Sequence, residues 1–377
     1  MMMVELPVID LEPYLLATGR DVTSSSSARH NATVLDLDIQ QHKDISEVCE
    51  RVASCLREAG ALVVRDPRCS FQDNDRFLDM MERYFGQTAE FKRQQERPHL
   101  HYQVGVTPEG VELPRCIVDK SLQEQIQELP EKSRPHMPLG PDAKWRYMWR
   151  VGPRPKKTSF KELNAEPVVP DGFPDWIEVM NGWGTKMIAA VEVVAEMAAI
   201  GFGIPQFAFT SLMSQGPHLL APTGSDLSKY SEERSIFAGY HYDLNFLSIH
   251  GKSRFPGLFI WLRSGEKISV NVPFGCLLVQ AGKQLEWLTG GECVAGMHEV
   301  VVTKGTQEAV EVAKKARQSL WRVSSTVFGH IASDAILQPL GKFANTPYAY
   351  KYPPTRAGEY VESELAAIKL KTKGYGD

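Results

Sequence analysis

Two patterns of hydrophobic residues divide the chain. In its first part apolar residues recur at helical spacing: Ile45, Val48, Val52 and Leu56 share one helix face, and Gly60 ends that helix. The apolar run "ALVVRD" that follows predicts a strand. The same spacing predicts further helices, and we expect them at 74–96, with Asn74 or Asp75 as N-cap, and at 173–203.

From about residue 215 the pattern changes to short β-branched or aromatic runs separated by Gly, Pro or Ser, such as "IFAGYHYDLNFLSIH", "GLFIWL" and "CLLVQAG". Such runs predict a sandwich or barrel of many short strands. A helical pattern at 305–318 interrupts them, and another follows near the C-terminus. Prolines concentrated between 99 and 170 predict loops and isolated strands. The chain therefore reads as mainly β with flanking helices.

Composition narrows the class of protein. With 43% hydrophobic and 23% charged residues the chain has an ordinary globular balance, and its net charge of −4 is too small to favour a nucleic-acid partner. The most apolar stretch, 187–205, contains two glutamates, which argues against a membrane span. The start of the chain lacks a signal-peptide pattern and no cysteines form a C-x-x-C pair, so we expect a cytoplasmic protein with free thiols.

The strand "AGYHYDLNFLSIHG" carries the candidate chemistry. His241 and Asp243 lie two residues apart and therefore point to the same strand face. A buried carboxylate there requires exposure, a salt bridge or a metal ion. His298, in "GMHEVVV", lies in another predicted strand. Two imidazoles and one carboxylate form the facial set that holds Fe(II) with open coordination positions, although each residue alone is as compatible with a surface pair or a core histidine.

Arg322 and Ser324, in "WRVSS", repeat the two-residue spacing on a later strand. A guanidinium beside a hydroxyl suits a carboxylate. Inside a barrel this pair would hold the distal carboxylate of a diacid whose other end chelates the metal.

The order His-x-Asp, His, Arg-x-Ser, over about 236–330, resembles the plant-type Fe(II)- and 2-oxoglutarate-dependent dioxygenases of the isopenicillin N synthase-like superfamily. "LPVIDL" and "EAGALVV" resemble that family's opening. The resemblance implies a double-stranded β-helix (jelly-roll) core at 211–345. A helical N-terminal region at 1–210, with a flexible insertion at 19–35, would precede the core, and a C-terminal helix at 346–377 would complete one structural unit.

The resemblance also implies the chemistry. His241, Asp243 and His298 would bind Fe(II), and Arg322 and Ser324 would bind 2-oxoglutarate. The enzyme would hydroxylate or desaturate a small organic metabolite with O₂, releasing succinate and CO₂, and ascorbate is a further candidate cofactor. No nucleic acid or membrane partner is expected.

Three departures from the family pattern keep alternatives open. The stretch "GPHLLAPTG" (216–224) lacks the Asn-x-Tyr whose tyrosine helps to bind 2-oxoglutarate, Lys283 replaces an Asp or Asn beside the family's "G-x-Q-L-E" strand, and the interval from His298 to Arg322 is long. If the helix at 305–318 did not bulge outside the barrel, Arg322 would miss the pocket. An Fe(II) oxidase that does not use 2-oxoglutarate and a non-catalytic ligand-binding jelly roll are the alternatives.

Candidate substrate-binding residues come from two segments. In "KWRYMWRVGPRP" the strand alternation puts three aromatic residues on one face and Arg146 and Arg150 on the other. The aromatic face could contact an aromatic or carboxylated molecule, or it could pack on the barrel while the arginines are solvated. The weak substrate candidates are Tyr102, Gln103, Trp145, Tyr147 and Trp149.

Overall fold

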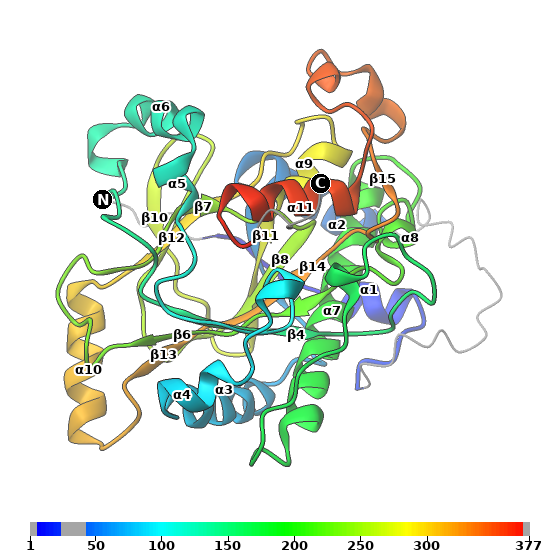
Figure 1. Cartoon of the computed structure of the whole chain (residues 1–377). Helices are drawn as coiled ribbons and strands as arrows, with labels where there is room; N and C mark the ends of the chain where they lie inside the picture. The colour runs from blue at the N-terminus through cyan, green and yellow to red at the C-terminus, as the bar shows by residue number, and fades with distance from the viewer. Residues whose placement is uncertain (1–5, 24–42, 372–377) are drawn as a thin grey trace.

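A computed structural model describes residues 6–23 and 43–371 (Figure 1), so the predicted flexible insertion at 19–35 lies outside the described residues from position 24 on. The helices are α1 (Glu12–Ala17), α2 (Lys43–Glu58), α3 (Phe71–Phe85), α4 (Ala89–Arg93), α5 (Arg115–Val118), α6 (Lys120–Glu128), α7 (Trp176–Gly201), α8 (Thr210–Met213), α9 (Lys283–Leu288), α10 (Lys304–Lys315) and α11 (Ala357–Ala367).

The strands are β1 (Val8–Asp10), β2 (Ala61–Arg65), β3 (Gly105–Thr107), β4 (Trp145–Arg150), β5 (Leu219–Leu220), β6 (Thr223–Asp226), β7 (Ile236–Tyr242), β8 (Leu247–Gly251), β9 (Leu258–Trp261), β10 (Lys267–Ser269), β11 (Cys276–Ala281), β12 (Met297–Val301), β13 (Trp321–Val323), β14 (Ser325–Gly329), β15 (Ile336–Leu337) and β16 (Thr355–Arg356).

Two sheets form the core. The larger has the order β1-β2-β11-β8-β14-β5-β4-β6-β13, with β3 added on β4, and the smaller has the order β10-β9-β12-β7. Nearly all pairings are antiparallel, and β1 with β2 is the parallel exception. Together the sheets make the predicted jelly-roll core, flanked by an N-terminal helical region and a C-terminal helix. Strands β2 and β4 come from the predicted N-terminal region and join the core sheet, while the domain boundaries at 210 and 345 stay a prediction.

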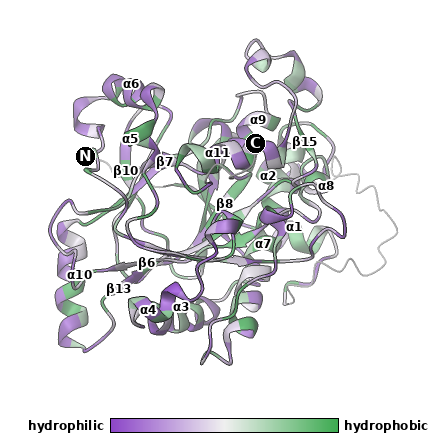
Figure 2. Ribbon diagram, in the orientation of Figure 1, coloured by the Kyte–Doolittle hydropathy of each residue, from purple (hydrophilic) through white to green (hydrophobic). Residues whose placement is uncertain are grey.

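The long helix α7 packs between α2 and the larger sheet, where it contacts β8 and β14. Its second half, from Met187 on, is mostly apolar and is buried on most sides (Figure 2). Its buried Glu196 is compensated: it accepts hydrogen bonds from the Tyr14 hydroxyl (3.0 Å) and from Arg20 (2.6 Å). No helix within 6–23 and 43–371 has the length and apolar character needed to cross a bilayer.

Three predicted elements differ from the structure. The helix expected at 74–96 begins at Phe71, because Ser70 and Asp73 form a capping box, and it ends at Phe85 before a second helix starts. The "Q-L-E" segment, expected to be a strand, lies in α9, which begins at Lys283. As far as residue 371, the predicted C-terminal helix at 346–377 is confined to α11, since it follows a 3₁₀ turn at Ala349–Lys351 and the short strand β16.

The predicted helix at 305–318 is α10, and it lies outside the two sheets at the edge of the molecule (Figure 1). It begins at a Thr303–Thr306 capping box. Its buried Val310 and Ala313 pack in a cluster with Phe237 of β7. The long interval between β12 and β13 is therefore absorbed on the exterior, and the strands keep their places in the core.

Close packing of α7 on α2 gives a stability prediction. A Cβ added at Gly201 would lie 2.1 Å from the backbone oxygen of Cys49 and 2.9 Å from the Cβ of Ala53. Gly201→Ala should therefore lower the free energy of unfolding by about 1–3 kcal/mol through overpacking. Gly182→Ala is the control in the same helix, where nothing lies within 4 Å, and it should raise stability by about 0.5–1 kcal/mol. Urea denaturation gives the free energy of unfolding of both variants. Equal values would contradict the close approach of α7 to α2.

Candidate metal centre and the two cavities that meet at it

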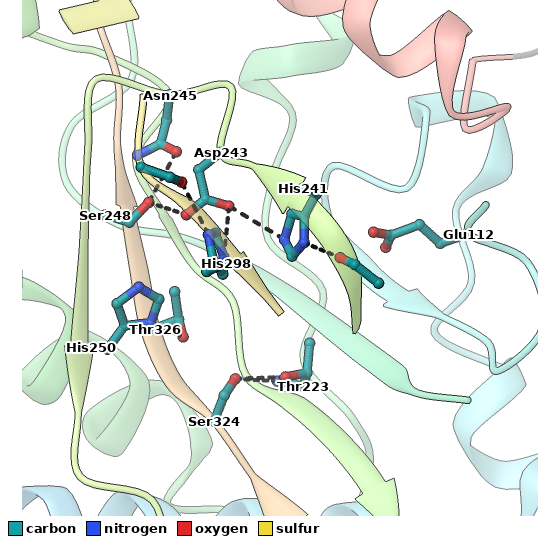
Figure 3. A network of polar contacts seen from close by, with 12 residues as sticks. Glu112, Thr223, His241, Asp243, Asn245, Ser248, His250, His298, Ser324 and Thr326 are labelled. Atoms are coloured by element: carbon teal, nitrogen blue, oxygen red, sulfur yellow. Dashed lines mark hydrogen bonds and ion pairs between the residues drawn. The ribbon is translucent and has the colours of Figure 1, made fainter. Parts of the chain in front are cut away.

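Three side chains converge between the sheets (Figure 3). His241 on β7 and His298 on β12 are directly opposed cross-strand partners, with ring centroids 4.1 Å apart. Their Nε2 atoms lie 3.8 Å and 3.7 Å from the same Oδ1 of Asp243. One ligand atom from each residue lies within 4.8 Å of the others, so the group could hold one metal ion.

Backbone carbonyls orient both rings. The Nδ1 of His241 lies 2.6 Å from the Gly239 oxygen, and that of His298 lies 3.3 Å from the Gly296 oxygen. A proton on each Nδ1 would be donated to these carbonyls, which leaves the Nε2 lone pairs directed toward Asp243. The arrangement therefore presents nitrogen donors without any rearrangement of the rings.

Electrostatics favours the protonation states that bind metal. Burial and the neighbouring His298 lower the pKa of His241 to about 3, so its ring is neutral at neutral pH. Burial alone would raise the pKa of Asp243, but the nearby histidines hold it at about 2. The Ser248 hydroxyl donates to Oδ2 of this carboxylate at 2.5 Å. Two imidazoles with one carboxylate fit the facial donor set of Fe(II).

Two cavities meet at this group. One runs from it toward Arg322 and Ser324, has a volume of about 490 Å³ and lies in the size range of small-molecule sites. The other extends in a different direction, toward the loop that carries Glu112 and the C-terminal Ile368 and Leu370. We call them the polar cavity and the outer cavity. His241, Asp243, Arg146 and Phe328 line both.

Arg322 is the one strongly buried cation of the polar cavity without an acidic partner within 6–23 and 43–371. Within the same ranges its side chain makes a single hydrogen bond, from Nε to the Pro256 oxygen at 3.3 Å. Burial lowers its pKa to about 10, so it stays charged at neutral pH. A buried guanidinium with unused donors calls for an anion.

Two hydroxyl groups line the same cavity as this guanidinium. Ser324 accepts the backbone N–H of Thr223 at 2.9 Å, and the two hydroxyls lie 2.7 Å apart. Thr223 belongs to the stretch in which the family tyrosine is missing, so a threonine lines the cavity there. The predicted pair Arg322–Ser324 thus lines the same polar cavity as the His-Asp-His group.

His250 is a polar residue that sequence reasoning missed. It lies on β8 between the His-Asp-His group and Ser324 (Figure 3), and its Nδ1 is 2.9 Å from the Thr326 hydroxyl. Its buried Nε2 has no hydrogen-bond partner in the part of the chain that the structure describes. Alternation from Ser248 could have placed it on the interior face, but only the pairing of β8 with β14 puts it in the cavity.

Lys283, one of the departures from the family pattern, is the first residue of α9. Its backbone N–H donates to the Asp243 backbone oxygen at 2.8 Å. Its ammonium pairs with Glu286 at 2.5 Å, one turn along α9, and lines neither cavity. The side chain therefore turns away from the candidate metal centre.

The predicted aromatic substrate contacts are corrected by the structure. Trp145, Tyr147 and Trp149 are buried in the main hydrophobic core and line neither cavity. Burial of large aromatic surface in the core is the stronger tendency, and the opposite face of β4 meets the cavities instead. Of the other two candidates, Gln103 lines the outer cavity, whereas Tyr102 packs against the core.

Residues around β4 and in the loop after β3 were missed as site residues. Lys144, directly before β4, alternates with Arg146 and Met148 on the strand, and each lines one or both cavities. Glu112 lines the outer cavity beside them. Only the pairing of β4 with β5 and β6 brings this strand to the same space as His241.

Comparison with known proteins agrees with this architecture. Residues 226–331 match the family model of the 2OG-Fe(II) oxygenase superfamily. Comparison with curated proteins gives no match. A 2OG-Fe(II) oxygenase family protein from Caulobacter crescentus shares the fold at 20% identity with a TM-score of 0.68, over 87% of this chain and 96% of that one.

Two further solved structures share the fold. A full-length protein from Neurospora crassa, in complex with alpha-KG and thymine, aligns at 18% identity with a TM-score of 0.66, over 96% of each chain. The dioxygenase for auxin oxidation from rice aligns at 13% identity with a TM-score of 0.59, over 96% of this chain and 95% of that one.

The matched residues 226–331 contain His241, Asp243, His298, Arg322 and Ser324, so the family model covers the strands that meet in the polar cavity. By this match residues 226–331 form a domain of the 2OG-Fe(II) oxygenase superfamily, which is the domain of an oxidoreductase of the dioxygenase type.

Proposed function

We propose that His241, Asp243 and His298 bind Fe(II), that Arg322 and Ser324 bind 2-oxoglutarate, and that the enzyme uses O₂ to hydroxylate or desaturate a small organic molecule, with release of succinate and CO₂. One observation carries this proposal. Within the described ranges, a buried guanidinium without an acidic partner lies in the same cavity as a ready metal-binding group.

Residues of the chain hold the candidate ligand atoms in position and line the cavity around them. Bound Fe(II) supplies the activation of O₂ and the oxidising chemistry. Three protein ligands leave coordination positions open for other molecules. Gly239, Gly296 and Ser248 hold the ligand atoms in place through hydrogen bonds. Residues of both sheets line the space.

The donors at the far end fit a dicarboxylic acid. With one end of 2-oxoglutarate at the metal, its distal carboxylate would meet the guanidinium fork of Arg322 and the hydroxyls of Ser324 and Thr223. The Nε2 of His250 is available along the way. These groups compensate for the missing family tyrosine, and they favour a 2-oxoglutarate enzyme over the oxidase alternative, which would leave the charge of Arg322 uncompensated.

Substrate is proposed to enter the outer cavity, because it reaches the same His241 and Asp243 from another side. The cavity has a volume of about 80 Å³, and its lining combines apolar side chains with charged and polar ones. The thymine and the auxin oxidation in the names of two structural neighbours support a small organic substrate. Ascorbate as a further cofactor stays a prediction.

Removal of one proposed ligand tests the metal site. Asp243→Ala should reduce retained iron more than about 100-fold, because the remaining imidazoles lose the only anionic donor of the set, while the far-UV circular dichroism is unchanged. Asp171→Ala, in an exposed loop, is the control and should keep the iron. Metal analysis after anaerobic loading with Fe(II) is the measurement, and full iron retention by Asp243→Ala would refute the assignment.

The hydroxyl that holds Asp243 gives a graded prediction. Ser248→Ala should weaken Fe(II) affinity about 10–100-fold, because partners that orient a ligand have effects of that size. Ser54→Ala on α2 lines neither cavity and should leave the affinity unchanged. Competition with a chelator gives both constants, and equal values would show that Ser248 does not orient the carboxylate.

The carboxylate anchor can be tested independently of the metal. Arg322→Ala should retain iron but raise the 2-oxoglutarate concentration for half-maximal binding at least about 100-fold, and Arg322→Lys should recover part of the loss. The readout is the visible charge-transfer band that Fe(II) with 2-oxoglutarate gives under anaerobic conditions. An unchanged band titration and unchanged succinate formation in Arg322→Ala would contradict the anchor and revive the oxidase alternative.

A further inference from the structure

Four charged side chains lie together in the wall beside His241. Lys144 pairs with Asp142 at 2.6 Å and with Glu112 at 3.0 Å, and Arg146 lies 2.9 Å from Glu112. The group, which we call the charged quartet, has two positive and two negative members and is therefore neutral overall. Asp142 also accepts the backbone N–H of Gly239, two residues before His241. The quartet is thus attached to the strand that carries the candidate metal centre.

Two hydrogen-bonding atoms of the quartet have no hydrogen-bond partner in the part of the chain that the structure describes. Lys144 donates to both acids, but Nε of Arg146 and Oε2 of Glu112 are buried and make no hydrogen bond within 6–23 and 43–371. The Nη1 of Arg146 lies 2.9 Å from Oε2 of Glu112, an ion pair that compensates the two charges but lacks hydrogen-bond geometry. One unused donor and one acceptor with free lone pairs therefore lie on neighbouring residues.

Both residues line the outer cavity together with His241. Figure 3 shows the Glu112 carboxylate directed toward the His241 side of the site from a separate segment. Buried polar groups in native proteins nearly always have partners, so an unsatisfied donor and acceptor in a cavity wall point to a ligand that supplies both. The rest of the wall mixes apolar side chains, including Leu219, Phe328 and Ile368, with polar and charged ones such as Arg115 and Glu364.

We propose that the substrate is an uncharged molecule with a hydrogen-bond acceptor next to an N–H donor, such as a carboxamide or lactam, held by Arg146 Nε and Glu112 Oε2. This inference rests on the proposed function, because it assigns the outer cavity to substrate. The amide oxygen accepts from Nε–H of Arg146, and its N–H donates to Oε2 of Glu112. The apolar part of the molecule packs on Leu219 and Phe328, close to His241.

Charge balance favours a neutral amide over a carboxylate or an ammonium group as the ligand. A carboxylate could accept from Arg146, but it has no proton for Glu112 and would add a negative charge to a neutral quartet. Burial raises the pKa of Glu112 while Arg146 and Lys144 lower it, with a net value of about 2, so Glu112 is an anion at neutral pH. An ammonium group would pair with Glu112 but would be repelled by Arg146 and Lys144.

Binding without turnover is the test. Protein loaded with Fe(II) and 2-oxoglutarate under anaerobic conditions is titrated with small cyclic and aryl carboxamides, each beside its carboxylate and its N,N-dimethylamide. Perturbation of the charge-transfer band and isothermal titration calorimetry report binding. Primary amides or lactams should bind at least about 10-fold more tightly than either counterpart, because only they satisfy both positions. If the carboxylates bind as tightly, or if no amide binds, the proposal is wrong.

Variants test the two contacts separately. Arg146→Met and Arg146→Lys should both lose at least about 10-fold in amide affinity, and the lysine variant keeps the charge beside Glu112 in case the methionine variant fails to fold. Glu112→Gln should shift the preference toward carboxylates, because it removes one negative charge from the quartet. Arg76→Met, an exposed arginine of α3, is the matched control. Unchanged selectivity in Glu112→Gln would overturn the proposal.

The charge-transfer band that Fe(II) and 2-oxoglutarate form without substrate separates failure of the substrate class from failure of the proposed function. Loss of amide selectivity with an intact band would reject the substrate class and leave the proposed function in place. Absence of the band in the unmodified protein would reject the proposed function itself.

Discussion

Burial of the Asp243 carboxylate is the constraint on which the site depends. An ionised carboxylate between two packed sheets is costly unless positive charge or hydrogen bonds meet it. The protein supplies the Ser248 hydroxyl and the imidazole rings of His241 and His298, whose Nε2 atoms lie 3.7–3.8 Å from the carboxylate, and the proposed Fe(II) would complete the charge balance. Arg322 poses the converse problem at the other end of the polar cavity. Such a cavity suits a molecule with one anionic end and one metal-chelating end.

Specificity is built on a different principle. Apart from Asp243, the charged side chains that line the outer cavity are ion-paired, so the quartet offers hydrogen-bonding positions without a net charge. Two cavities that share His241 and Asp243 can therefore differ in the ligand that each prefers, one for an anion and one for a neutral molecule. The quartet also ties the loop around Glu112 and the strand β4 to β7 through Asp142 and Gly239.

The local sequence pattern was sufficient to predict some of the helices and strands of this protein and the faces on which several site residues lie. Period-two alternation put His241 with Asp243, and Arg322 with Ser324, on common faces, and turn-bounded short strands indicated the β core. Helical periodicity located α2, α7 and α10, although the capping box at Ser70 moved the start of α3. These features are set by residues near one another in sequence, whose side-chain directions follow from backbone geometry.

Only the tertiary structure decided which faces look inward and which strands meet. Alternation divided β4 into an aromatic face and a basic face but could not say which meets the cavity. The aromatic residues are in the core because burying their large apolar surface against the helices is the more favourable arrangement, and Arg146 faces the site. Glu112, Thr223 and His250 join the site through pairings between distant strands and loops, and no local pattern encodes such contacts.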